Sequence, residues 1–294
     1  MLSTISQVLQ IIAPVFILAA IGFLWVKAGW EYNVKFVTRV TMTLAVPCLI
    51  FTSLVRSEIE VTALRNTALA ALVAYVLVTV VSSVILRGLK YDQRTFLPPM
   101  VFGNTGNLGL PLAFFSFGAV GFDFAVVIFA IMAFLSFTIG IWFVSGGKSV
   151  AVAIKEPMVW STVFGALFVI FDWDLPDWSM NALDLVGQMG IPLMLITLGV
   201  AITRLHPASL NRAVWLSLMK LVICVAIPVG VGIIIDLPPL AFAALILQVA
   251  TPVAVTSYML AEKYGADSGE VAGLVVVSTL FSILAIPLIL VFLI

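Results

Sequence analysis

About ten long apolar stretches run through this sequence, separated by short polar segments. Each stretch approaches the roughly 20 residues that an α-helix needs to cross a bilayer. The predicted spans are residues 5–27, 34–55, 66–87, 96–117, 122–145, 157–172, 181–203, 213–235, 239–261 and 271–293. The sequence therefore predicts an all-α polytopic membrane protein with about ten transmembrane helices.

The composition argues against a soluble fold. Of the 294 residues, 63% are apolar and 10% are charged, whereas soluble domains carry roughly 45–50% and 25%. So few polar groups could not cover the surface of a soluble protein. The N-terminus, MLSTISQVLQ, lacks the basic segment and cleavage site of a signal peptide, so we expect the first apolar stretch to remain as a span.

Basic residues are distributed unevenly between the two sides of the predicted membrane. The even-numbered loops hold Arg56 and Arg65. The odd-numbered loops and span ends hold Lys27, Lys35, Arg39, Arg87, Lys90, Arg94, Lys148, Lys155, Arg204, Arg212 and Lys263. Because cytoplasmic loops are enriched in Lys and Arg, we expect the odd loops in the cytoplasm and both termini outside. In a bacterial plasma (inner) membrane the termini would then be periplasmic.

The two halves of the chain resemble each other weakly. Pro14 and Gly22 in the first span recur as Pro157 and Gly165 in the sixth, and VPCLIFTSLV in the second span recurs as IPLMLITLGV in the seventh. This predicts two five-span repeats, residues 1–146 and 156–294. Because five is odd, the repeats enter the membrane from opposite sides, which is the inverted arrangement of many secondary transporters.

The fourth span contains several residues that disfavour a helix. Gly103, Gly106, Gly109 and Pro111 lie within nine residues, and in a helix a glycine costs roughly 1 kcal/mol and a proline roughly 3. We therefore predict a break in this span. Irregular backbone at membrane depth is tolerated only inside protein or beside a wet cavity.

Asn104, Thr105 and Asn107 lie at this predicted break. Their side chains can cap freed backbone groups or hydrogen-bond a ligand. The half-helix that follows the break would point its N-terminus, with about +0.5 charge, towards the cavity, and such a terminus favours an anion such as a carboxylate.

The ninth span contains Thr251, Pro252 and Thr256 in a matching position. Two broken helices at corresponding places in two inverted halves point to a binding site near the midplane. Gln188, in the seventh span, is predicted to line the same site together with Thr251 and Thr256. The alternative is that these prolines only kink helices for close packing.

Two charged residues lie near or within the predicted spans. Lys220 is about eight residues into the eighth span and could snorkel to the cytoplasmic surface or take part in ion coupling. Asp184, near the outer end of the seventh span, could bind a proton or cation or remain a solvated carboxylate.

The sequence offers little for catalysis or for a cofactor. The single histidine, His206, lies in a loop, so neither a metal cluster nor a Ser-His-Asp arrangement is expected. There is no phosphate-binding GxxxxGK[ST] motif and no basic run for nucleic acid. We therefore expect no enzyme activity, no cofactor and no nucleic-acid partner.

Three runs resemble the auxin efflux carrier family, which includes bacterial permeases often described as malonate or malate carriers. They are LAVPCLIF from Leu44, GNTGNLGLPLAFFSFG from Gly103 and ATPVAVTSYMLAEKYG from Ala250. The resemblance implies ten spans with outward termini and a fold similar to that of bile acid sodium symporters. It matches Pro111 and Pro252 to the prolines at which two helices cross, and Asn104 to an asparagine that contacts the substrate carboxylate.

The same resemblance implies a scaffold domain from spans 1, 2, 6 and 7, a mobile transport domain from spans 3–5 and 8–10, and a homodimer. The resulting hypothesis is a secondary transporter that moves a small organic carboxylate, auxin-like or a dicarboxylate, by elevator-type alternating access. One alternative is a Na⁺- or H⁺-coupled symporter of the same fold. The other is a membrane sensor that does not transport.

Overall fold

The computed structural model describes residues 2–57, 59–147, 157–203 and 210–293. Within these ranges each predicted span falls on helix, and the β-structure is an isolated bridge between Gly103 and Val253. The all-helical prediction is therefore confirmed. The basic residues Lys148, Lys155 and Arg204, which contributed to the predicted orientation, lie outside the described residues, as does His206.

The first half of the chain contains the first five predicted spans. Its elements are α1 (Leu2–Lys27), α2 (Val34–Val40), η1 (Thr41–Ala45), α3 (Val46–Arg56), α4 (Val61–Gly88), α5 (Gln93–Val101), η2 (Thr105–Gly109), α6 (Leu110–Leu135), η3 (Ser136–Gly140) and α7 (Ile141–Val144). The η elements are π-helical turns that continue the neighbouring α-helices, so α2, η1 and α3 form one unbroken path.

The second half contains the other five predicted spans. Its elements are α8 (Pro157–Phe171), α9 (Asp177–Gln188), α10 (Gly190–Ile202), α11 (Leu210–Ile235), α12 (Pro239–Val249), α13 (Val255–Tyr264) and α14 (Ser268–Leu293). The helix pair α9 and α10 bends at Met189, and α12 and α13 are separated by five non-helical residues.

Six helical segments of the described chain are long and apolar enough to cross a membrane. One of them, Thr105–Val144, contains two helices, because Gly118 has a non-helical backbone conformation with φ 66° and ψ −163°. Shorter apolar helices occur at Ala13–Lys27, Trp160–Phe171 and Pro239–Val249. These lengths and compositions are those of an integral membrane protein.

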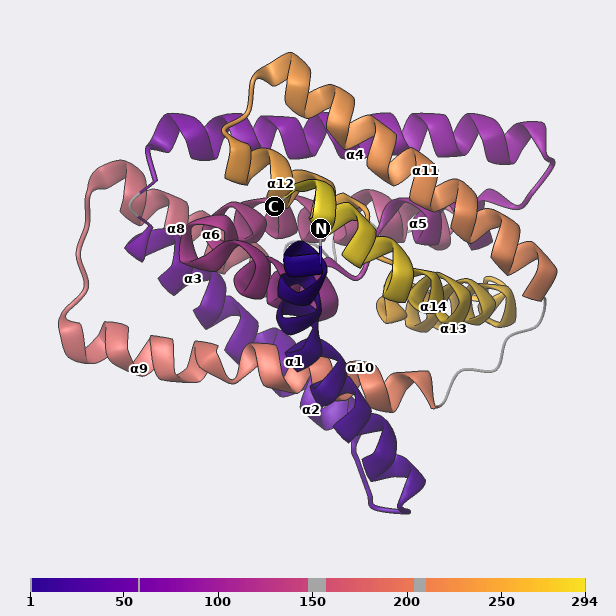
Figure 1. The fold of residues 1–294 in the computed structure, drawn as a ribbon, viewed down its shortest axis with the longest axis horizontal. Coiled ribbons are helices and arrows are strands. Elements are labelled where there is room, and N and C mark those ends of the chain that lie inside the picture. Colours follow the sequence, from indigo (N-terminus) through magenta and orange to yellow (C-terminus); the bar gives the residue numbers. More distant parts are fainter. Residues whose placement is uncertain (1, 58, 148–156, 204–209, 294) are drawn as a thin grey trace.

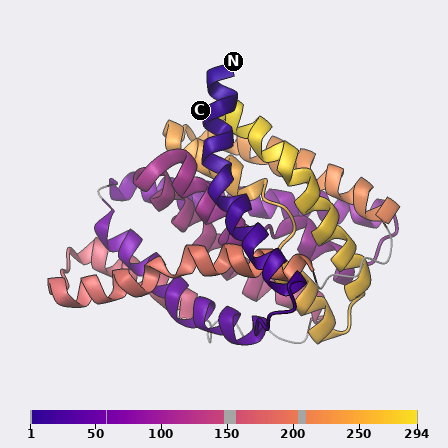
Figure 2. The same ribbon diagram turned by 60° about the horizontal axis from the view of Figure 1, so that its bottom comes forward.

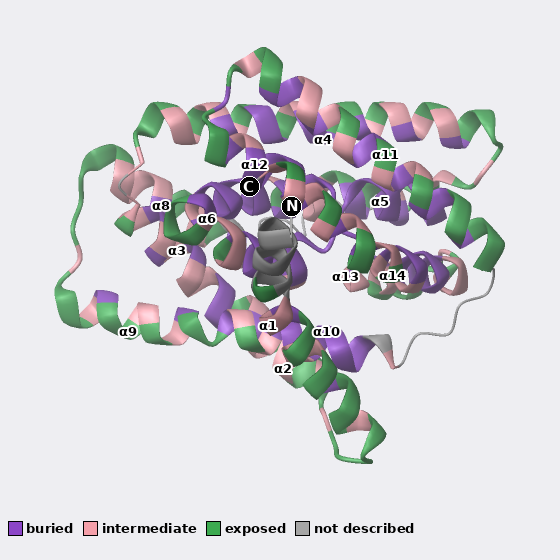
Figure 3. Ribbon diagram, in the orientation of Figure 1, coloured by how far each residue is buried: buried purple, intermediate pink, exposed green. Residues whose placement is uncertain are grey.

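The interrupted helices lie in the centre of the molecule. In Figure 1, α5, α6 and α12 lie between α4 and α11 on one edge and α9 and α10 on the other, and Figure 2 shows α1 crossing α10. In Figure 3 the central helices are mostly buried, whereas α9 and α11 carry many exposed positions, and α14 is mostly buried in its first half and partly exposed in its second. The exposed positions on α11 and α14 are largely Leu, Ile, Val and Phe, as expected for surfaces that face lipid.

Glycines allow close helix crossings in the outer group of helices. A Cβ on Gly22 of α1 would lie 2.0 Å from the backbone oxygen of Ile196, and a Cβ on Gly199 of α10 would lie 1.8 Å from that of Ala19. On α8, a Cβ on Gly165 would lie 3.0 Å from the Leu54 side chain of α3. Small residues thus bring α1 against α10 and α8 against α3.

The tryptophans mark the ends of the helices. Each exposes at least 40% of its surface, and each lies within a few residues of a helix end. They are Trp25, Trp30, Trp142, Trp160, Trp173, Trp178 and Trp215. Aromatic residues concentrate at both membrane–water interfaces, so this placement fits helices that cross a bilayer.

Candidate functional site

The two interrupted helices meet at residues 102–104 and 250–254, which we call the crossover. Gly103 and Val253 form an antiparallel bridge, and the Asn104 N–H donates a hydrogen bond to the Pro252 carbonyl oxygen at 2.7 Å. Breaking a helix in a membrane leaves backbone groups that are costly unless they find partners. At the crossover each broken helix supplies some of the partners that the other lacks.

Glycine is required where the two breaks touch. A Cβ on Gly103 would lie 2.2 Å from Thr251 Oγ1, and a Cβ on Gly109 would lie 2.3 Å from Gln248 Oε1. Thr251 has little freedom to move, because its hydroxyl donates to the Gln248 carbonyl oxygen at 2.7 Å. Gly106 is also tight, with a Cβ position 3.1 Å from the Phe129 ring.

One side of the crossover, the N-terminal face, is formed where η2 and α13 begin. Asn104, Gly106, Asn107, Ala254 and Thr256 line a common cavity of about 50 Å³. Asn104 and Ala254 are the N-cap residues of the two helices, and neither side chain caps its helix. First-turn N–H groups of both helices therefore remain available, and both helix dipoles place positive potential near this cavity.

Buried polar atoms without protein partners gather at this face. Asn104 Nδ2, Thr105 Oγ1 and Asn107 Oδ1 are buried and form no hydrogen bond within the described chain. Buried polar groups are normally hydrogen-bonded, so such a group calls for an explanation. A ligand or water held at the N-terminal face would satisfy them.

The opposite wall of the N-terminal face comes from other helices. Asn107 and Thr256 also line a second cavity of about 30 Å³, together with Thr41 of η1 and Thr197 of α10. The Thr197 hydroxyl lies 2.8 Å from the hydroxyl of Tyr32, in the segment between α1 and α2. Burial raises the pKa of the Tyr32 phenol, which keeps it protonated.

The other side of the crossover, the C-terminal face, is formed where α5 and α12 end. Lys220 of α11 is buried there, with 3% of its surface exposed, and its ammonium donates to the Met100 carbonyl oxygen at 3.1 Å. A cavity of about 20 Å³ joins Lys220 to Ser217, Thr251 and Ser278. The idea that Lys220 snorkels to the surface is therefore wrong, because its amine points into the protein.

The structure divides the predicted site residues between the two faces of the crossover, the crossover itself and a separate cavity described below. Asn104, Thr105, Asn107 and Thr256 lie together at the N-terminal face, and Thr251 belongs with the C-terminal face. Pro252 lies in the crossover itself. Pro111, expected at the helix break, instead lies within the continuous helical path of η2 and α6, directly after the π-helical turn, and the break lies at residues 102–104.

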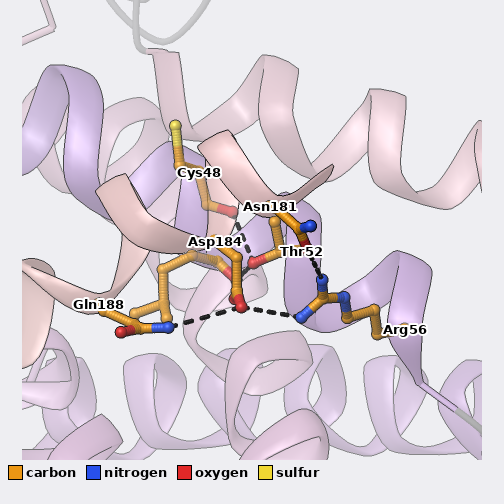
Figure 4. Close-up of polar contacts among 7 residues, drawn as sticks. Cys48, Thr52, Arg56, Asn181, Asp184 and Gln188 are labelled. Atoms are coloured by element: carbon orange, nitrogen blue, oxygen red, sulfur yellow. Dashed lines mark hydrogen bonds and ion pairs between the residues drawn. The ribbon is translucent and has the colours of Figure 1, made fainter. Parts of the chain in front are cut away.

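Gln188 does not reach the crossover. It lines a separate cavity of about 500 Å³, the outer vestibule, between α3, α9, the start of α10 and α6. There, its amide donates to Asp184 at 3.5 Å, and Asp184 forms an ion pair with Arg56 at 2.8 Å (Figure 4). Asn181 also accepts from Arg56. The expectation that Gln188 lines the same cavity as Asn104 and Asn107 is not met.

Two residues were missed by sequence reasoning. Gln248 is fully buried on α12 beside Gly109, and neither atom of its amide has a protein partner among the described residues. Asp123 of α6 accepts a hydrogen bond from Ser53 of α3 at 2.5 Å in the outer vestibule. A polar residue amid the apolar run of α12 was the available signal for Gln248, whereas the pairing of Asp123 depends on tertiary packing.

Two interrupted helices that meet at a polar, partly unsatisfied crossover are an arrangement that many secondary transporters use. Sequence comparison gives the family. The profile of the family described as "Membrane transport protein" matches residues 7–152 and 144–290, so the chain belongs to that family. This confirms the resemblance to the auxin efflux carriers.

Two relatives carry similar descriptions. An "Uncharacterized transporter" of Methanothermobacter thermautotrophicus is 25% identical over 300 residues, covering 97% of this chain and 96% of the relative. A second "Uncharacterized transporter", from Methanocaldococcus jannaschii, is 27% identical over 200 residues, which cover 63% of this chain and 64% of the relative. The family and these relatives identify the chain as a transporter and not an enzyme.

Proposed function

We propose that this protein moves a small organic carboxylate across the membrane by alternating access. The observation that carries the proposal is the N-terminal face, where two helix N-termini, the unpaired amide nitrogen Nδ2 of Asn104 and the side chain of Asn107 line one cavity. Helix N-termini bind anions through free N–H groups and the helix dipole. Neutral amides add hydrogen bonds, and the described residues that line this cavity include no carboxylate that would repel the ligand.

The proposed fold has ten spans in two inverted five-helix repeats. The repeat-related glycines support it: Gly22 packs α1 against α10, and Gly165 packs α8 against α3. Exchanging the repeats converts the first of these helix pairs into the second. The two breaks, in α5/η2 and α12/α13, also fall in the fourth and ninth spans, which are counterparts in such an arrangement.

The proposed motion carries one group of helices past the other. The scaffold would comprise α1–α3 and α8–α10, and the transport domain α4–α7 and α11–α14. The outer vestibule lies between these groups, and the Ser53–Asp123 hydrogen bond crosses it. In an elevator-type cycle the transport domain would slide with the crossover, and this hydrogen bond would break and re-form.

The proposed setting is a bacterial plasma membrane with both termini outside. A homodimer through the scaffold follows from the family resemblance. Cross-linking of the protein in membranes, before detergent extraction, tests the dimer. Labelling of single cysteines placed in the segments after α1 and after α8 tests the orientation, because these two loops are expected on opposite sides of the membrane.

A thermal-shift screen of the detergent-purified protein tests the substrate class. A ligand that binds only the folded protein raises its apparent stability by mass action. We expect a shift with at least one of malonate, malate, succinate or indole-3-acetate. The shift should be lost in Asn104→Ala and kept in Asn211→Ala, since Asn211 is an exposed asparagine at the start of α11, away from the cavity.

Other outcomes would favour the alternatives. A shift with Na⁺ alone would favour a cation-coupled symporter. Carboxylate binding without counterflow in proteoliposomes would favour a sensor. An Asn104→Ala protein that binds and moves substrate as well as the wild type would contradict the site assignment.

A further inference from the structure

We propose that Lys220 is a tethered cation that fills the cation-binding position of the crossover, so that the protein carries its substrate without Na⁺. The proposal rests on the proposed anion transport and specifies how that transport is coupled. It concerns the C-terminal face, which the proposed substrate site does not use.

The position of Lys220 is that of a bound cation. Its side chain comes from α11 and is buried, and its ammonium hydrogen-bonds the Met100 carbonyl oxygen near the end of α5. The last carbonyls of a helix have no partner within the helix, and the helix dipole makes this end favourable for a positive charge. In transporters with discontinuous helices, such carbonyls and helix C-termini are the groups that coordinate Na⁺.

The surroundings of Lys220 offer oxygen atoms but no opposite charge. None of the described carboxylates forms an ion pair with it, and its other contact is the Cys224 sulfur at 3.8 Å. The adjoining cavity is lined by Ser217, Thr251 and Ser278, and the Ser217 hydroxyl is buried without a protein partner. Hydroxyl and carbonyl oxygens are ligands for a hard cation.

A purely structural role for Lys220 explains less of this arrangement than a role in transport does. A charge inside a membrane protein is costly and usually marks an ion or substrate pathway. A leucine or methionine would fill the space behind α5 without that cost, but would leave the Met100 carbonyl without this donor. The ammonium both satisfies the carbonyl and keeps a second cation out by repulsion, because like charges interact strongly at low dielectric.

The first test uses the wild-type protein. Proteoliposomes would be loaded with the carboxylate that gives a thermal shift, and counterflow would be measured in Na⁺, K⁺ or N-methylglucamine buffers. We expect equal rates in all three. A wild-type rate, or a wild-type carboxylate shift, that requires Na⁺ would overturn the proposal. Absence of any carboxylate shift would instead count against the proposed function, so the two failures are distinguishable.

The second test removes the tethered charge. We expect Lys220→Ala to lose counterflow in N-methylglucamine and to regain activity or thermal stability when Na⁺ or methylammonium is added. Lys220→Gln, which is neutral but keeps a hydrogen-bond donor, serves if the alanine variant does not fold. A neutral variant that transports as fast as the wild type in N-methylglucamine would contradict the role of Lys220.

Discussion

The two faces of the crossover differ in how they present positive potential. At the N-terminal face it comes from backbone N–H groups and the helix dipoles, beside the neutral amides of Asn104 and Asn107. At the C-terminal face it comes from a full charge, the ammonium of Lys220, held against the Met100 carbonyl. In the proposed function, ligands would exchange at the first face, whereas the ammonium occupies the second. The crossover would then receive an anion on one side only.

The largest expected effect comes from a substitution that pushes the two interrupted helices apart at the crossover. Gly103→Ala would place a methyl group 2.2 Å from Thr251 Oγ1 and 2.9 Å from the Thr251 carbonyl oxygen. Because backbone lies on both sides of the contact, the crossover must shift, at a cost of about 1–3 kcal/mol. We expect a clear fall in the apparent melting temperature and loss of transport.

Gly230→Ala is the matched control for this prediction. Gly230 lies inside α11, and a Cβ there would meet no atom within 4 Å. Alanine is the better helix former by about 1 kcal/mol. We therefore expect stability to be unchanged or higher. Equal losses in both variants would mean that the contact with Thr251 does not hold the crossover together.

The next effect is confined to the N-terminal face. Asn107→Ala removes a side chain that lines both cavities there. A hydrogen bond to a charged ligand contributes about 1.5–3 kcal/mol, so we expect the dissociation constant for the carboxylate to rise roughly 10- to 100-fold. Isothermal calorimetry or the thermal-shift titration measures this. Unchanged affinity would mean that the substrate does not contact Asn107.

The contrast between the faces also marks the limit of sequence reasoning. The run from Gly103 to Pro111 predicted a broken helix, and its asparagines do lie together at one cavity. Local chemistry sufficed there, because glycine and proline disfavour a helix wherever they occur. The residues that form the break were not predictable from this chemistry alone: Pro111 lies within the helical path, directly after a π-helical turn, whereas the break lies at residues 102–104.

Positions that depend on packing between helices were not predictable in the same way. Snorkelling to the membrane surface was one of the two possibilities for Lys220, but α11 turns its side chain towards the end of α5. Gln188 was expected at the crossover, but α9 carries it to the outer vestibule beside Asp184 and Arg56. Both outcomes follow from which face of a helix meets its neighbour, and in an almost uniformly apolar chain that face leaves little trace in the sequence.

A smaller effect should separate stability from binding. Thr251→Val keeps the shape of the side chain but removes the hydroxyl that bonds the Gln248 carbonyl oxygen. A buried hydrogen bond of this kind contributes about 1 kcal/mol. We expect a modest fall in the apparent melting temperature with carboxylate affinity unchanged, because Thr251 faces the side of Lys220 and not the cavity of Asn107. A loss of affinity as large as that of Asn107→Ala would mean that the substrate contacts both faces of the crossover.

The smallest effect is expected in the outer vestibule, where the charges of Arg56 and Asp184 are exposed by 47% and 32%. Ion pairs this exposed contribute about 0–1 kcal/mol, and the contact of Gln188 with Asp184 is long, at 3.5 Å. We therefore expect Gln188→Ala to change carboxylate affinity and stability less than any variant at the crossover, in the same calorimetric assay. In the proposed elevator Gln188 would belong to the scaffold and Asn107 to the transport domain, so a strong loss of affinity in Gln188→Ala would mean that substrate binds with the vestibule closed around it. The weak effect expected here would instead place the binding site at the N-terminal face, between the interrupted helices and the residues of η1 and α10 that form its opposite wall.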